Sequence, residues 1–267
     1  MVLVDFDETI STIETTPLLG QFGLDTNNNT LPWQYFIDTY MEDYNRIEAS
    51  LPETIQPEDR IKRFREAEEA SLTRLNEHHV FQGLTRQQIF DKATDMAGEI
   101  LKKNALLTLK SASRSNRLRV ISLNWSKDWI RGFLAPLELS YEQIYCNDLV
   151  YDRKGKATGE IKMDVLTSYD KKVLMKRIKK HLRKGTPIIY IGDSGGDVLP
   201  LVNADAGIVI GNRSSLLRSL KEDFNRTVIE NTLPALKKQP TIYRVDNWDQ
   251  IKDSKILLPP HHYKTKP

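Results

Sequence analysis

The chain has 267 residues, of which 39% are hydrophobic and 28% are charged, with a formal net charge of +3. This composition is that of an ordinary globular protein with one enlarged domain or two, and it excludes a disordered or fibrous chain. The single cysteine, Cys146, excludes an intrachain disulfide and a Cys-x-x-Cys zinc or redox site. The small net charge gives little support to nucleic acid as a partner.

The first twenty residues do not resemble a signal peptide. Asp5, Asp7 and Glu8 fall where the apolar stretch of such a peptide would lie. No apolar run along the sequence approaches the length that a bilayer span requires. We therefore expect a cytosolic protein that does not enter a membrane.

Four short apolar runs predict buried parallel strands. Each run stops at a small or polar residue, and the runs occupy residues 1–4, 118–121, 187–191 and 206–210. Helical patterns at 128–134, 170–184 and 198–203 lie between the later runs. Strands that alternate with helices predict an α/β domain built around a parallel sheet.

A long segment separates the first two strands. Ser122 follows Asp5 by 117 positions, far more than one crossover helix requires. Apolar residues at helical spacing predict helices over 31–49, 58–79 and 85–103. We therefore expect a helical cap over 15–107, inserted into a core made of 1–14 and 108–258, with a disordered tail over 259–267.

A second irregularity predicts a β-hairpin. Residues 144–151 and 156–163 have strand character and flank a turn that contains Gly155.

Polar side chains that could take part in catalysis or binding follow the predicted strands. Asp5 and Asp7 come after the first strand, Ser122 after the second, and Asp193 and Asp197 after the third. The carboxyl ends of parallel strands form the edge where ligands bind in open α/β sheets. We expect these side chains to meet there, together with Lys171 at the start of the helix over 170–184.

The residue types at this edge suit a phosphate and a divalent cation. Four clustered carboxylates repel one another unless a cation is present, and ligands that are all oxygen suit Mg²⁺. Two carboxylates at one site can divide the roles of nucleophile and proton shuttle. Lys171 offers a point charge to phosphate oxygens, and Ser122 offers a hydroxyl with adjacent backbone N–H groups.

At these residues the sequence resembles the haloacid dehalogenase (HAD) superfamily of aspartate-nucleophile phosphohydrolases. The match covers the whole core, with residues 5–9, 120–122, Lys171 and 192–197 as the four motifs. The sequence is most similar to the phosphoserine-phosphatase-like branch, which has a helical cap between the first two motifs and a hairpin like that of 146–160. It is also similar to fungal members of that branch, in which Asn-Trp-Ser follows the second motif, as at 124–126. The resemblance implies a doubly wound, Rossmann-like core.

The resemblance also implies a role for each site residue. Asp5 would attack phosphorus and become an aspartyl-phosphate, and Asp7 would act as general acid and then as general base. Asp5, the backbone carbonyl of Asp7 and Asp193 would hold Mg²⁺. The phosphoryl group would be held by Ser122, Leu123 and Lys171, and Thr9 and Asp197 would support the site.

Two positions depart from the pattern of the family. Lys172 stands beside Lys171 and remains an alternative for the phosphate-binding lysine. Leu123 and Asn124 stand where the phosphoserine branch usually has two glycines, so we do not transfer phosphoserine as the substrate.

The sequence thus predicts a Mg²⁺-dependent phosphomonoesterase, a HAD-type phosphatase that acts on a small phosphorylated metabolite. One alternative is a phosphotransferase or mutase with the same covalent intermediate. Another is a catalytically idle binding protein that keeps the fold. The sequence names neither the substrate nor the oligomeric state.

Overall fold

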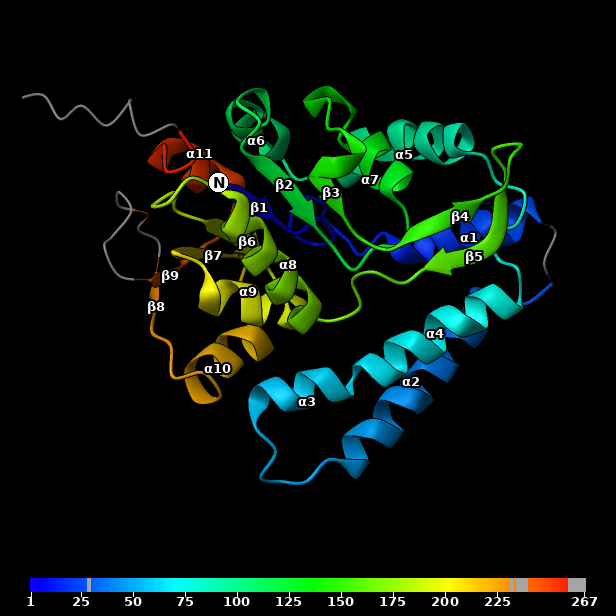
Figure 1. Ribbon diagram of the computed structural model, residues 1–267, viewed down its shortest axis with the longest axis horizontal. Helices are drawn as coiled ribbons and strands as arrows, with labels where there is room; N and C mark the ends of the chain where they lie inside the picture. Colours follow the sequence, from blue (N-terminus) through cyan, green and yellow to red (C-terminus); the bar gives the residue numbers. More distant parts are fainter. Residues whose placement is uncertain (28–29, 231–232, 234–239, 259–267) are drawn as a thin grey trace, which may run out of the picture.

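The computed structural model describes residues 1–27, 30–230, 233 and 240–258 (Figure 1). The tail predicted over 259–267 lies outside these residues.

A seven-stranded sheet, parallel throughout, forms the centre of the molecule, in the order β3-β2-β1-β6-β7-β9-β8. Its strands are β1 (Val2–Val4), β2 (Leu118–Ile121), β3 (Ile144–Tyr145), β6 (Ile189–Gly192), β7 (Ala206–Ile210), β8 (Val228–Glu230) and β9 (Thr241–Val245). The sheet confirms the predicted parallel α/β architecture. β1 lies between β2 and β6, so the strand order reverses beside it, which is where open α/β sheets form a ligand crevice.

Helices cover both faces of the sheet, as in a doubly wound fold (Figure 1). Val2 and Val4 of β1 belong to a core that includes α6 (Ala105–Arg114), α7 (Lys127–Phe133) and α11 (Trp248–Ser254). Leu3 points the other way, into a second core with α8 (Ser168–His181), α9 (Val198–Asn203) and α10 (Ser214–Glu222). Alternate residues of a strand face opposite sides, so a short apolar run supplies both cores.

The segment between β1 and β2 is helical, as predicted. It contains α1 (Thr16–Thr26), α2 (Trp33–Ser50), α3 (Pro57–Arg63), α4 (Arg65–Glu77) and α5 (Arg86–Ile100). The single helix expected over 58–79 is two helices, because the chain leaves regular helix at Phe64, whose ring stacks on Tyr44 of α2 at 4.4 Å between centroids. Helices α2 and α4 lie side by side, whereas α5 lies against α7 (Figure 1).

The hairpin is present, but its predicted first strand over 144–151 was too long. β3 joins the main sheet beside β2, and only β4 (Asp148–Tyr151) pairs with β5 (Ala157–Lys162) in the antiparallel hairpin. Asn147 separates them because its side chain is held by Leu123, Asp164 and Val165.

The prediction also omitted β8 and β9, at one edge of the sheet. Three short 3₁₀ helices complete the described elements: η1 (Ala135–Leu137), η2 (Tyr141–Gln143) and η3 (Gly195–Asp197). None of the described helices has the length and apolar character needed to cross a membrane.

Candidate active site

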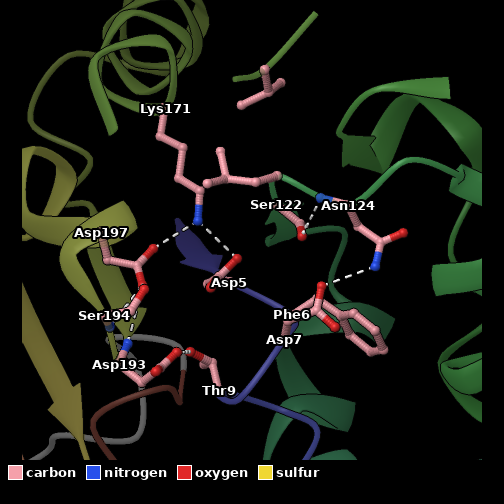
Figure 2. Close-up of polar contacts among 12 residues, drawn as sticks. Asp5, Phe6, Asp7, Thr9, Ser122, Asn124, Lys171, Asp193, Ser194 and Asp197 are labelled. Carbon is pink, nitrogen blue, oxygen red and sulfur yellow. Dashed lines mark hydrogen bonds and ion pairs between the residues drawn. The ribbon is translucent and has the colours of Figure 1, made fainter. Parts of the chain in front are cut away.

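The polar residues predicted from the strand ends lie together at the carboxyl edge of β1, β2 and β6 (Figure 2). Asp5, Ser122 and Asp193 each follow one of these three strands directly, and each is buried. Lys171 reaches the same place from the first turn of α8. The parallel register of the three strands brings their ends to one point.

Lys171 links two of the carboxylates. Its Nζ atom lies 2.8 Å from Asp5 Oδ1 and 2.8 Å from Asp197 Oδ1 (Figure 2). Burial alone would lower the pKa of Lys171, but Asp197 and Asp5 raise it above its ordinary value, so the side chain is an ammonium. Burial, reinforced by Asp197, raises the pKa of Asp5. The site therefore holds a fixed positive charge in contact with a carboxylate at the end of β1.

The loop after β6 is organised by Asp197. Its Oδ2 atom accepts hydrogen bonds from the backbone N–H groups of Asp193 (3.1 Å) and Ser194 (3.2 Å), and its Oδ1 atom accepts one from Tyr190 Oη (2.7 Å). A Cβ at position 192 would overlap the Asp197 carboxyl group, so this turn requires Gly192. The bonds fix the direction of Asp193 without using its carboxylate.

Asp193 faces two further partners. Thr9 Oγ1 donates a hydrogen bond of 2.8 Å to its Oδ1 atom, and Arg213 Nη2 lies 3.3 Å from its Oδ2 atom. Burial and the negative charge of Asp197 raise the pKa of Asp193 to about 7. Thr9, predicted as a supporting residue, thus lies in contact with the carboxylate after β6.

Asp5, Asp193 and Asp197 form a cluster that can hold a metal ion. One carboxylate oxygen of each lies within 4.8 Å of the others, and all three residues are buried. Their crowding disfavours three negative charges, and a divalent cation would relieve this repulsion. A donor set made only of oxygen fits Mg²⁺. The Asp7 carboxylate is not in this cluster, and the role predicted for its backbone carbonyl remains a prediction.

Asp7 lies at the same edge but is held by a separate set of groups. Its Oδ1 atom accepts hydrogen bonds from the backbone N–H (2.8 Å) and the hydroxyl group of Thr15, and its Oδ2 atom accepts one from Asn124 Nδ2 (2.9 Å). Burial and the nearby Glu14 carboxylate raise the pKa of Asp7 to about 7, although these hydrogen bonds lower it. A carboxyl group with a pKa raised toward neutrality is suited to exchange a proton near pH 7.

Asn124 and Thr15 hold the Asp7 carboxyl group, a contact that the sequence reasoning did not predict. The buried Asn124 binds both Asp7 and the Thr15 hydroxyl group (3.2 Å), and Trp129 Nε1 donates to that hydroxyl group at 3.0 Å. The Asn124 Oδ1 atom also accepts the backbone N–H groups of Trp125 and Ser126. The Asn-Trp-Ser tripeptide was the signal that could have found this arrangement.

Ser122 lies beside Asp5 at the end of β2. Its Oγ atom accepts a hydrogen bond of 3.1 Å from the Asn124 backbone N–H, and Ser122 and Leu123 line the same cavity as Lys171. Lys172 points away, since its Nζ atom lies 2.5 Å from Glu58 Oε2 on α3. Of the two lysines, the structure brings Lys171 to the carboxylates.

A cavity of about 320 Å³ opens above these residues. Asp5, Asp7, Ser122 and Lys171 line it at the sheet edge, and side chains of α2 and α4 line it from the other side. Trp33 of α2 approaches Trp125 at 6.0 Å between ring centroids. The helices of the insert thus cover the carboxyl edge of the sheet.

Contacts with α8 hold α3 and α4 near the site. Arg65 Nη1 lies 2.8 Å from Asp170 Oδ1, in addition to the pair between Lys172 and Glu58. Lys62 Nζ lies 4.7 Å from the centre of the Tyr169 ring. These residues flank Lys171, so the position of the helices is coupled to the segment that carries it.

The sheet order, the inserted helices and the hairpin together resemble the fold of a solved haloacid dehalogenase (HAD) hydrolase. Solved structures agree: a HAD family hydrolase from Salmonella enterica matches with a TM-score of 0.53 and 14% identity, over 97% of this chain and 71% of its own. A phosphoserine phosphohydrolase-like protein from Francisella tularensis matches with a TM-score of 0.52 and 14% identity, over 94% and 97% of the two chains.

Two fungal proteins are similar in sequence. Cold tolerance protein 1 of Saccharomyces cerevisiae is 25% identical over 246 residues, which cover 79% of this chain and 78% of its own. CTO1 family protein C17G9.12c of Schizosaccharomyces pombe is 26% identical over 276 residues, which cover 94% and 98% of the two chains. No family model matches the chain. The predicted likeness to HAD proteins and to fungal relatives is therefore confirmed.

Proposed function

We propose that the protein is a Mg²⁺-dependent phosphomonoesterase that hydrolyses a small phosphorylated metabolite through an aspartyl-phosphate. One observation carries this proposal. Asp5 contacts the ammonium group of Lys171 in the wall of a cavity. A second acidic residue, Asp7, lines the same cavity and is held by a separate set of hydrogen bonds. A nucleophile, a fixed cation and a separate acid are what transfer of a phosphoryl group requires.

In the first step, a carboxylate oxygen of Asp5 attacks phosphorus and forms a new P–O bond. The ester bond between phosphorus and the alcohol oxygen breaks, and Asp7 donates its proton to that oxygen as it leaves. Lys171, together with the Ser122 hydroxyl group and the Leu123 backbone N–H, binds the phosphoryl oxygens and stabilises their negative charge.

In the second step, water hydrolyses the aspartyl-phosphate. Asp7, now a carboxylate, takes a proton from the attacking water, the bond between Asp5 and phosphorus breaks, and inorganic phosphate leaves. A Mg²⁺ ion held by Asp5 and Asp193, with Asp197 in support, would neutralise charge on the phosphoryl group. Asn124 and Thr15 position Asp7 in both steps.

A phosphotransferase or mutase would share the first step and differ in the acceptor. An acceptor hydroxyl would replace water in the second step, and a mutase would return the phosphoryl group to its own substrate. Release of inorganic phosphate in the absence of any acceptor distinguishes hydrolysis from both. An idle binding protein would release none.

The test is release of phosphate from p-nitrophenyl phosphate with Mg²⁺ or with EDTA. We expect Asp5→Asn to lower the rate by about a thousandfold or more, since it removes the nucleophile. Asp253→Asn, which makes the same change on the exposed face of α11, is the matched control and should retain the wild-type rate. Full activity in Asp5→Asn, or in EDTA, would contradict the proposal.

A further inference from the structure

The cavity wall carries acidic side chains besides Asp5 and Asp7. Glu68 lines it from α4, across from the strand ends, and Glu14 lies near both Glu68 and Asp7, since its charge raises the pKa of each. Lys171 is the one basic side chain among the described residues that form the wall, and it is already in contact with Asp5 and Asp197. A ligand that enters this cavity therefore meets the ammonium group of Lys171 at the strand ends and the Glu68 carboxylate on the opposite wall.

Glu68 differs from its neighbours on α4. Glu66 pairs with Arg46 at 3.1 Å and Glu69 pairs with Arg65 at 2.7 Å, both on the outer surface. Within the described residues Glu68 has no Lys or Arg partner, and its Oε1 atom accepts a hydrogen bond of 2.8 Å from Tyr40 Oη. Burial raises the pKa of Glu68 to about 7, and Glu14 reinforces this effect. A carboxylate held in this way gains strongly from a nearby positive charge.

Four aromatic side chains of the described residues also line the cavity. They are Trp33, Phe36 and Tyr40 of α2, and Trp125. Trp33 lies 5.5 Å from Phe36 and 6.0 Å from Trp125 between ring centroids. Rings and carboxylates around one space are the surroundings that recognise an organic cation, since ring faces attract positive charge and exclude water.

We propose that the substrate is the phosphate ester of an alcohol that carries an ammonium group and no carboxylate. This inference rests on the proposed function and adds the class of the leaving group. With its phosphate at Lys171 and Asp5, the ester places its ammonium group between Glu68, Glu14 and the aromatic rings. A carboxylate on the same alcohol would meet Glu68 and Glu14 with no described cation to bind it. An uncharged alcohol would leave Glu68 without a counterion.

Two pairs of esters test the charge and the carboxylate separately. Phosphocholine and 3,3-dimethylbutyl phosphate have the same shape and differ in the positive charge. Phosphoethanolamine and phosphoserine differ in the carboxylate. We expect kcat/KM to favour phosphocholine and phosphoethanolamine, each by about tenfold or more over its partner. The preference should lie mainly in KM, because the charge is remote from the reacting bond.

Glu68→Gln assigns the preference to this wall of the cavity. We expect this variant to lower the ratio of kcat/KM for phosphocholine to kcat/KM for 3,3-dimethylbutyl phosphate by about fivefold or more. Glu66→Gln removes the same charge from the outer face of α4 and should leave the ratio unchanged. A ratio that Glu68→Gln does not change overturns the assignment.

Failure of this inference and failure of the phosphatase proposal give different results. Equal hydrolysis of the charged and neutral esters overturns the substrate class and leaves the phosphatase proposal intact. If no ester releases phosphate, the phosphatase proposal fails. In that case, binding of phosphocholine and 3,3-dimethylbutyl phosphate to the Asp5→Asn protein with Mg²⁺, measured by calorimetry, tests the proposed class of ligand. Tighter binding of phosphocholine supports it, and equal or absent binding overturns it.

Discussion

Lys171 and Lys172 are neighbours on α8 but point to different parts of the molecule. Lys171 is buried between Asp5 and Asp197, and Lys172 reaches Glu58 on α3. We expect Lys171→Met to lower kcat/KM by about a hundredfold or more, because it removes the fixed charge at the strand ends. It should also lower the free energy of unfolding by about 3 kcal/mol, since it leaves buried carboxylates unpaired.

Lys172→Met is the matched control for that variant. It breaks a partly exposed contact with α3, so kcat/KM should stay within about threefold of the wild type. Steady-state kinetics and urea unfolding of both variants provide the comparison. A larger loss of activity in Lys172→Met than in Lys171→Met would transfer the phosphate-binding role to Lys172.

The raised pKa of Glu68 predicts a dependence of stability on pH. Its pKa rises from an ordinary 4.5 to about 7 on folding, so between these values the folded state binds more protons than the unfolded state. The contribution of Glu68 to the free energy of unfolding is therefore fully present below pH 4.5 and is lost as the pH rises to 7. In the absence of substrate, the free energy of unfolding of Glu68→Gln, measured relative to the wild type, should increase by about 1 to 3 kcal/mol from pH 5 to pH 8.

Urea unfolding at the two pH values measures this gain. Glu66→Gln, on the exposed side of the same helix, should change by less than about 0.5 kcal/mol over that range. An equal gain in both variants would mean that Glu68 titrates as an exposed side chain.

At the scale of elements, two glycines in helices have opposite surroundings. A Cβ on Gly20 of α1 would overlap the indole ring of Trp33, whereas a Cβ on Gly98 of α5 meets nothing within 4 Å. Alanine favours a helix over glycine by about 1 kcal/mol, so Gly98→Ala should raise the free energy of unfolding by about 0.5 to 1 kcal/mol. Gly20→Ala should lower it by about 1 to 3 kcal/mol, because the overlap outweighs the gain in propensity.

Thermal and urea unfolding of the two variants test this contrast. Gly20→Ala should also change the fluorescence of the tryptophans, because Trp33 must move in the cavity wall to make room. Stabilisation by both substitutions would mean that α1 and α2 pack more loosely than the structure describes.

At the scale of the whole molecule, the carboxylate cluster predicts that Mg²⁺ stabilises the fold. Asp5, Asp193 and Asp197 come from two strand ends far apart in sequence, so an ion bound among them is bound only by the folded chain. At about a hundredfold excess over its dissociation constant, Mg²⁺ should raise the melting temperature by about 5 to 10 °C. Calorimetry with and without EDTA measures the shift.

Asp193→Asn should abolish most of that shift, and Asp253→Asn should retain it. A shift of the same size in Asp193→Asn would place the ion elsewhere. The boundaries proposed for core and cap, and the cytosolic location, stay predictions at this scale.

The sequence by itself indicated the parallel α/β architecture, because short apolar runs that alternate with helical patterns are typical of central strands buried on both faces. It also identified Asp5, Asp7, Ser122, Asp193 and Asp197 as site candidates, since residues that follow parallel strands lie at one edge of the sheet, and it added Lys171 at the start of a helix. Edge strands such as β8 escaped prediction because they are short and only partly buried, so their apolar pattern is weak.

Only the tertiary structure decided which groups surround these residues. Asn124 lies 117 positions from Asp7, and Glu68 lies 28 positions from Tyr40, so neither hydrogen bond leaves a local pattern in the sequence. The choice between Lys171 and Lys172 depended on the rotation of α8 about its axis, which packing against the sheet sets. The chemistry of the strand ends is local in sequence, but the acidic and aromatic wall of the cavity exists only where α2 and α4 fold over the sheet.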